Sequence, residues 1–151
     1  MATKKTVEVK AEFSPEQMKH LDFIQGVINR MGSNSFQMKG WMVTIVSALL
    51  GIYANNHNWL YPLFGLFPTI IFGALDAYYL QQERIFRGLY NDVAGITTPS
   101  REIKPFEMPL NLYKGGKYSF ENVIWSVSIW PLYLPVIIIL LVIAIVLTPN
   151  L

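Results

Sequence analysis

The sequence has 151 residues, of which 52% are hydrophobic and 15% are charged, with a net charge of +2. A soluble domain has about 25% charged residues, so this composition indicates a protein with much of its surface in lipid. The absence of cysteine excludes disulfides, thiolate nucleophiles and cysteine-based metal sites. His20 and His57 lie too far apart for an HExxH zinc motif, and no GxSxG, P-loop or dinucleotide-binding motif occurs. We therefore expect a protein that is not an enzyme and holds no cofactor or metal.

Residues 1–37 are predicted to form a cytoplasmic strand followed by an amphipathic helix. Residues 6–13 alternate polar and apolar side chains, as a half-buried strand does. The sequence SPEQ at residues 14–17 is a capping-box signature with proline at the first helical position. Apolar residues then recur every three or four positions over residues 18–31. The weak helix formers at residues 32–35 leave open a kink, a break or a close contact.

A transmembrane hairpin is predicted over residues 38–80. Residues 38–54 carry one charge, at Lys39, and residues 59–80 carry one charge, at Asp76. As helices these stretches measure roughly 26 and 33 Å, which suits a hydrocarbon core of about 30 Å. Both stretches are therefore interpreted as membrane spans.

The link between these spans, NNHN at residues 55–58, is short enough for a tight turn. In an antiparallel hairpin closed by such a turn, facing residues have numbers that sum to about 113. This register predicts a salt bridge between Lys39 and Asp76, an acid that is otherwise costly near hydrocarbon. The alternative is that Asp76 meets headgroup water.

Residues 81–122 are predicted to form a cytoplasmic helix extension followed by a loop and strand segment. The helical pattern continues over residues 86–93, and Glu83 and Arg87 are spaced as a helix-supporting pair. Residues 102–110 have the proline-interrupted pattern of an edge strand, which is available to pair with the N-terminal strand.

Residues 123–151 are predicted to form an interfacial helix and a third transmembrane span. Residues 123–147 carry no charge, and a helix that is apolar on every side belongs in lipid or deep inside protein. Pro131 and Pro135 are expected to kink or split this helix. The result is an interfacial segment to about residue 130 followed by a shorter crossing.

All twelve lysines and arginines precede or open the first span, or lie between the second and third spans. The positive-inside rule then places the N-terminus in the cytoplasm and the C-terminus outside. The predicted fold class is an all-α membrane protein with three transmembrane helices, helical extensions and a small cytoplasmic α+β portion.

Small and hydroxyl residues share one face of each of the first two spans. In lipid, such faces let helices approach closely. They either pack the helices of one hairpin together or line and close a conduit, and three spans per chain require a homo-oligomer for the second role. A tetramer is the favoured state. The candidate pore or interface residues are Gly40, Thr44, Ser47, Gly51, Thr69 and Gly73.

The cytoplasmic segment combines basic groups, glycines and tyrosines in a pattern suited to a nucleotide or a single-stranded nucleic acid. The segment 81–122 also contains acidic residues, so a solvated turn is the competing interpretation. The candidate ligand-binding residues are Arg101, Lys104, Tyr113, Lys114, Lys117 and Tyr118.

The runs LDFIQGVINRMGSNSFQMKGWMVTIVSALLG (residues 21–51) and LDAYYLQQERIFRGLYNDV (residues 75–93) resemble small bacterial membrane proteins of defence-associated operons. Examples are the transmembrane effectors of CBASS and Hailong-type anti-phage systems. The resemblance covers about residues 20–95. It implies an oligomeric channel of the bacterial inner membrane that depolarises the cell under control of a nucleotide or oligonucleotide made by a partner nucleotidyltransferase. The alternative function is a non-conducting membrane adaptor or anchor that regulates a partner enzyme.

Overall fold

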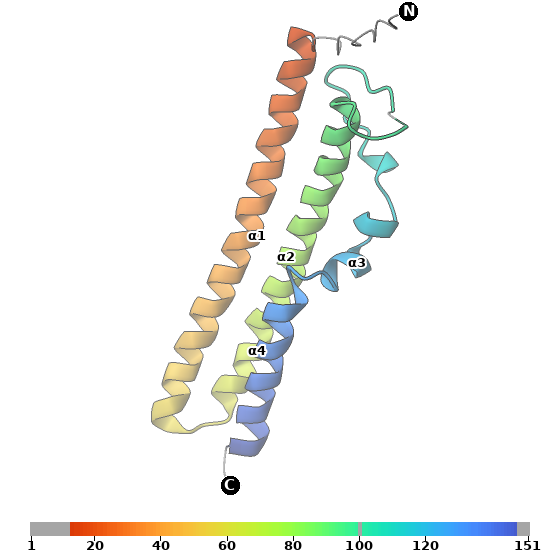
Figure 1. Ribbon diagram of the computed structural model, residues 1–151. Coiled ribbons are helices and arrows are strands. Elements are labelled where there is room, and N and C mark those ends of the chain that lie inside the picture. The colour runs from red at the N-terminus through yellow and green to blue at the C-terminus, as the bar shows by residue number, and fades with distance from the viewer. Residues whose placement is uncertain (1–12, 100, 148–151) are drawn as a thin grey trace, which may run out of the picture.

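The computed structural model describes residues 13–99 and 101–147, and its architecture is a long helical hairpin with a third leg along one side (Figure 1). Helix α1 (Pro15–Asn56) and helix α2 (Leu60–Val93) run antiparallel and are joined by a tight turn. The N-terminal part of α2 packs against helix α4 (Trp130–Val142), which runs back toward the turn. A connector, defined as residues 94–119, links α2 to the short helix α3 (Phe120–Ile124) that precedes α4.

The start of α1 confirms the predicted capping box. The backbone N–H of Gln17 donates to the Ser14 hydroxyl at 3.2 Å, and the backbone N–H of Ser14 donates to the Gln17 side-chain oxygen at 2.9 Å. Both bonds satisfy amides that the first helical turn leaves without partners. The helix continues without interruption through Gly32 and ends where His57 adopts a left-handed φ of 51°. Of the alternatives for residues 32–35, the break is excluded and the close contact is confirmed, because a Cβ placed on Gly32 would lie 3.3 Å from Glu83 Oε2.

The third leg is divided between α3 and α4 rather than forming one helix over residues 123–147. Pro131 lies at the start of α4, where its missing N–H costs no hydrogen bond. A turn separates the two helices, and the last residues that the structure describes adopt a π-helix, Ile143–Leu147. The predicted break near residue 130 is confirmed, and the apolar helix that follows it is shorter than α1 and α2.

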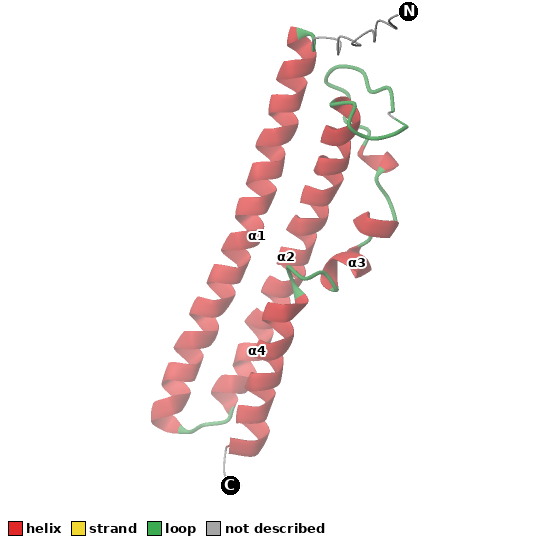
Figure 2. Cartoon of the chain, viewed as in Figure 1, coloured by secondary structure: helices red, strands yellow, loops and turns green. Residues whose placement is uncertain are grey.

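The predicted strand at residues 102–110 is wrong, because the described residues contain helices, turns and loops but no strand (Figure 2). Pro105 and Pro109 remove backbone donors from this segment. Its apolar side chains Ile103 and Leu110 instead pack on the cluster formed by the two long helices and Tyr113. Most of the N-terminal strand expected as its partner, residues 6–12, lies outside the described residues. The small α+β portion therefore gives way to an irregular connector packed on helices.

Two separate hydrophobic clusters hold the legs together. In the half of the molecule near the turn, Met42 and Val46 of α1 pack with Tyr133 and Leu140 of α4. In the opposite half, residues of α1 and α2 pack with the connector around Leu89. The turn end and the connector end therefore have independent packing.

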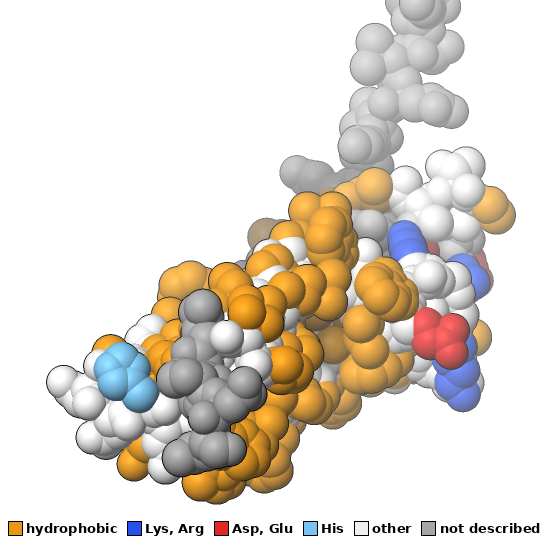
Figure 3. Space-filling model, turned by 90° about the horizontal axis from the view of Figure 1, so that it is seen from below, with side chains coloured by type: hydrophobic (Ala, Val, Ile, Leu, Met, Phe, Trp, Pro, Cys, Tyr) orange, Lys and Arg blue, Asp and Glu red, His pale blue; other side chains and the backbone are white. Residues whose placement is uncertain are grey.

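Helices α1 and α2 are long and apolar enough to cross a membrane. Only 17% and 22% of their apolar windows are buried inside the chain, whereas the core helix of a soluble protein is mostly covered by protein. Seen from the turn end, hydrophobic side chains cover most of the surface, and charged side chains lie to one side (Figure 3). This distribution is consistent with a membrane protein whose apolar half includes the turn.

Candidate functional site

The structure separates the predicted pore or interface residues into two groups. Thr69 and Gly73 of α2 face α4 inside the same chain. Thr69 is only 1% exposed, and a Cβ placed on Gly73 would lie 3.2 Å from the Tyr133 ring. A Cβ on Gly65, one turn before Thr69, would lie 3.2 Å from Leu140. The small-residue face of α2 therefore serves packing within the chain.

The small-residue face of α1 is exposed, although Ser47 also borders a cavity lined by α4. Gly40, Thr44, Ser47 and Gly51 are all exposed, and no atom of the described residues lies within 4 Å of a Cβ placed on Gly40 or Gly51. The Thr44 hydroxyl is satisfied by its own helix, because it donates to the Gly40 carbonyl at 2.9 Å. The exposed residues that share this face recur at alternating steps of three and four, the spacing of a helix seam that packs on another helix. We call this face the α1 seam; its members are Ser33, Gln37, Gly40, Thr44, Ser47, Gly51 and Ala54.

A polar cluster joins α1 to α2 at the edge of the apolar half. The predicted ion pair is present, with Lys39 Nζ at 2.5 Å from Asp76 Oδ2. The Ser35 hydroxyl donates to the other oxygen of Asp76 at 2.5 Å, and Lys39 Nζ donates to the Ser35 oxygen at 3.2 Å. Asp76 is fully buried, and the side chain of Lys39 is 24% exposed. The acid is therefore held by two partners from α1, and its pair with Lys39 keeps an exposed edge.

Ser35 was missed in the sequence analysis. Its position one turn before Lys39 puts both side chains on the same helix face, and this spacing was a usable signal. The hydroxyl of Tyr133, from α4, lies 3.5 Å from the carbonyl oxygen of Phe72. All three legs therefore meet close to this polar cluster.

A second cluster lies where the connector packs on the end of α2. The Tyr113 hydroxyl donates to Asp92 Oδ2 at 2.7 Å, and Arg101 Nη1 lies 3.9 Å from the same oxygen. The guanidinium also lies 5.6 Å from the centre of the Tyr113 ring, a cation–π distance. Burial and the adjacent Asp92 carboxylate raise the pKa of the Tyr113 hydroxyl well above its ordinary value, so this group stays protonated as a donor.

The tyrosine pair extends this cluster along the connector. The rings of Tyr113 and Tyr118 are 5.7 Å apart in an edge-to-face arrangement. Lys117 Nζ lies 5.1 Å from the centre of the Tyr118 ring. Both rings pack over Gly88, where an added Cβ would lie 2.7 Å from Tyr113 Cδ1 and 2.5 Å from the Tyr118 hydroxyl. Only glycine allows the connector to approach α2 this closely at this position.

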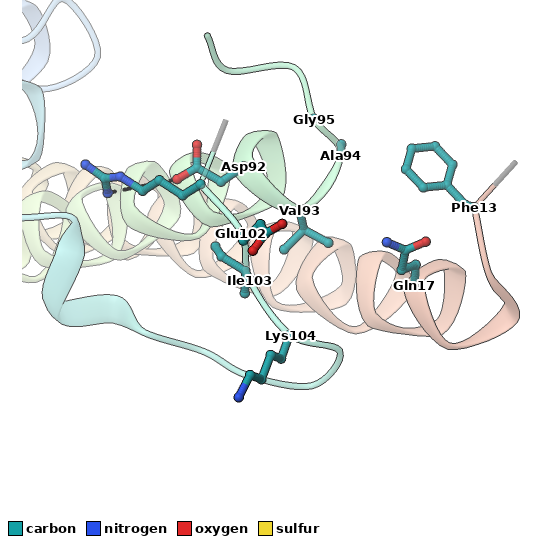
Figure 4. Close-up of a pocket in the computed structure, with 10 residues that line it drawn as sticks. Phe13, Gln17, Asp92, Val93, Ala94, Gly95, Glu102, Ile103 and Lys104 are labelled. Atoms are coloured by element: carbon teal, nitrogen blue, oxygen red, sulfur yellow. Dashed lines mark ion pairs between the residues drawn. The ribbon is translucent and has the colours of Figure 1, made fainter. Parts of the chain in front are cut away.

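Two cavities flank Asp92 and Arg101. The first, of about 320 Å³, is lined by both tyrosines and Lys117 as well as by this ion pair, and we call it the connector cavity. The second, of about 440 Å³, lies toward the start of α1 and is lined by Lys104, among others (Figure 4).

The structure thus brings four predicted ligand residues together around the connector cavity: Arg101, Tyr113, Lys117 and Tyr118. Lys104 lies at the second cavity, and Lys114 is exposed and lines neither. Asp92 and Gly88 also line this cavity, although neither belongs to a local sequence pattern that indicates a site.

His20 is buried under the connector. It is fully buried, and its ring lies 5.9 Å from that of Phe106. Neither ring nitrogen has a hydrogen-bond partner of standard geometry among the described residues. Burial lowers the pKa of His20 below its ordinary value, and the nearby backbone of Glu107 offsets this only in part. The structure therefore favours the neutral imidazole.

This burial predicts an acid-sensitive stability. The side chain of histidine in an unfolded chain titrates near pH 6.5. The stabilising contribution of the buried, neutral His20 is therefore fully present above about pH 6.5, and it is lost as the pH falls from there through the lower folded pKa. Unfolding of the detergent-solubilised protein measured from pH 7.5 to 5 should show this loss. His20→Leu should reduce the pH dependence, and His57→Asn, a change in the exposed turn, should retain it. An equal pH dependence in wild type and His20→Leu would contradict the assignment.

Among the described residues, no group of three or more histidine or acidic side chains is placed to hold a metal ion. No known protein family, curated protein or solved structure matches the chain. The two polar clusters, the cavities and the α1 seam are therefore the features from which a function can be inferred.

Proposed function

We propose that this chain is a multi-pass protein of the bacterial inner membrane that assembles into a homo-oligomeric channel-type effector of anti-phage defence. The exposed α1 seam carries this proposal. Contact with lipid tails does not require small or hydroxyl side chains. Close packing of a second helix does favour them. In a tetramer, the four α1 seams, one from each chain, together surround a common axis. Thr44 and Ser47 then face the conduit, and bulkier neighbours close it by dewetting.

The proposed topology has three crossings with the N-terminus in the cytoplasm. The third crossing, residues 130–146, measures roughly 26 Å, and a crossing slightly shorter than the hydrocarbon core is accommodated by local bilayer thinning. Lys39 then lies at the cytoplasmic boundary, where its exposed edge reaches the headgroups. All fixed positive charges lie on the cytoplasmic side.

The effector is controlled by a cytoplasmic nucleotide or oligonucleotide supplied by a partner nucleotidyltransferase. The clustering of Arg101, Lys117 and the two tyrosines around the connector cavity supports this part of the proposal. The connector leads directly into α3 and α4. A change at the cavity therefore reaches the third crossing through the chain itself.

Ion flux into liposomes tests the channel. We expect the purified protein to form an oligomer and to conduct, either without ligand or with a panel of mononucleotides and short oligonucleotides. Ser47→Trp, on the α1 seam, should abolish flux and alter the oligomer. Ile52→Trp, exposed on another face of the same helix, should leave both unchanged.

An ordered oligomer that gives no flux under any of these conditions would overturn the channel and favour the alternative, a non-conducting adaptor that regulates a partner enzyme. The small-residue face of α2 packs on α4 of the same chain. This packing favours the second function, because small residues that serve packing require no conduit.

A further inference from the structure

We propose that the connector cavity selects a nucleoside phosphate by two opposed contacts: Arg101 and Lys117 bind its phosphate, and Asp92 accepts hydrogen bonds from its base or sugar. This inference rests on the proposed function, because it takes the cavity to be the cytoplasmic control site. It adds to the proposed function that the bound unit is a single nucleoside phosphate and that Asp92 selects it.

The position of the cavity favours a soluble ligand over a lipid headgroup. Gly88 and Asp92 follow Asp76 by 12 and 16 residues on the same continuous helix, or about 18 and 24 Å along its axis. With Asp76 at the membrane boundary, the headgroup layer extends only about 5–8 Å beyond it. The cavity therefore lies farther out than a headgroup reaches.

The basic side chains retain the capacity to bind an anion. Arg101 is exposed, its distance of 3.9 Å from Asp92 is long, and it donates to the carbonyl of Leu112 at 3.3 Å. Since a guanidinium has five N–H donors, donors remain for a phosphate, which arginine binds in a bidentate manner. Lys117 adds an exposed positive charge on the same cavity.

Asp92 makes the cavity unsuitable for phosphate alone. Its side chain is 4% exposed, and the one hydrogen bond from Tyr113 leaves acceptor positions on a carboxylate that has about four. A buried acceptor gains from a ligand that brings N–H or O–H donors and repels an anion that brings none. A nucleobase edge or a ribose diol supplies such donors.

The rings and the size of the cavity suit one nucleotide unit. Tyr113 and Tyr118 offer aromatic surface, and base–aromatic stacking is worth about 1–3 kcal/mol per base. At about 320 Å³, the cavity lies at the lower end of the range for small-molecule sites. A single nucleoside phosphate, free or as part of a longer ligand, fits these limits.

Calorimetry on the full chain in nanodiscs of zwitterionic lipid tests the inference. The probes are AMP, GMP, CMP and UMP, compared with inorganic phosphate and with the free nucleosides. We expect at least one monophosphate to bind tenfold or more tightly than phosphate or its own nucleoside. Arg101→Gln should weaken this monophosphate at least tenfold, whereas Lys114→Gln, outside both cavities, should leave its Kd unchanged.

Asp92→Asn should bring the Kd of this monophosphate to within about threefold of that of inorganic phosphate, since an amide is a poorer acceptor for base or sugar donors. Tyr113→Phe removes the hydrogen bond to Asp92 but retains the ring, and it should preserve the preference for the monophosphate. A loss of preference in Tyr113→Phe equal to that in Asp92→Asn would show that Asp92 only positions the tyrosine, which overturns the inference.

Three further outcomes would also overturn it: phosphate binding as tightly as every monophosphate, no binding of any probe, or competition by vesicles containing phosphatidylglycerol. None of these measurements uses ion flux. A protein that binds the monophosphate but does not conduct therefore refutes the channel alone. A protein that conducts but fails the binding tests refutes this inference alone.

Discussion

Replacing Lys39 with methionine is expected to destabilise the folded hairpin by about 3 kcal/mol, at the lower end of the range for removing one member of a buried ion pair. The fully buried Asp76 would lose its charged partner, while the hydrogen bond from Ser35 would remain. Because Lys39 is partly exposed, we do not expect the upper end of the range. Reversible unfolding in mixed detergent micelles gives the free-energy difference.

The double variant Lys39→Met with Asp76→Leu is the control for this prediction. It removes both charges, and apolar replacements of a buried pair are often neutral or stabilising. The double variant should therefore be more stable than Lys39→Met alone. Asp76→Asn should cost less than Lys39→Met, because the exposed edge of Lys39 can extend to solvent. A decrease in the free energy of unfolding of less than about 0.5 kcal/mol for Lys39→Met is typical of exposed ion pairs. Such a result would show that the pair is not buried in the folded protein.

Replacing Gly88 with alanine should displace the connector from α2. The new Cβ would lie 2.7 Å from Tyr113 Cδ1, a distance that the ring can escape only by moving away from the hydrophobic cluster. Overpacking of this kind costs about 1–3 kcal/mol. We expect faster amide exchange over residues 110–118 and faster tryptic cleavage after Lys114 and Lys117.

Gly26→Ala is the matched control for Gly88→Ala. No part of the chain that the structure describes lies within 4 Å of a Cβ at this helical position. The change should therefore leave the connector unaffected and stabilise α1 by up to about 1 kcal/mol through helix propensity. Exchange over residues 110–118 that is identical in both variants would contradict the close packing at Gly88.

Local signals in the sequence were sufficient for the helical framework. The capping box at Ser14 and Gln17, the short turn and the antiparallel register depend on residues near in sequence or on simple counting, and the register placed Lys39 beside Asp76. The split in the third leg followed from Pro131, whose ring limits where a helix can start.

The sequence was less informative about the connector. The proline-interrupted pattern of residues 102–110 predicts an edge strand, but such a pattern does not distinguish pairing with a strand from packing on a helix. The bond from Tyr113 to Asp92 and the approach of two rings to Gly88 join positions more than 20 residues apart, and no periodic pattern encodes them. These contacts arise from the tertiary packing of the connector on α2.

The unbroken course of α1 through Gly32 has a mechanical consequence. His20 and Ser47 lie on one helix without a swivel between them, about 40 Å apart along its axis. A displacement of α1 where the connector covers His20 is therefore transmitted toward Ser47 along a continuous helix, and it must pass the Lys39–Asp76 pair that joins α1 to α2. In the proposed topology, this continuity links the cytoplasmic end of α1 to its membrane-spanning part.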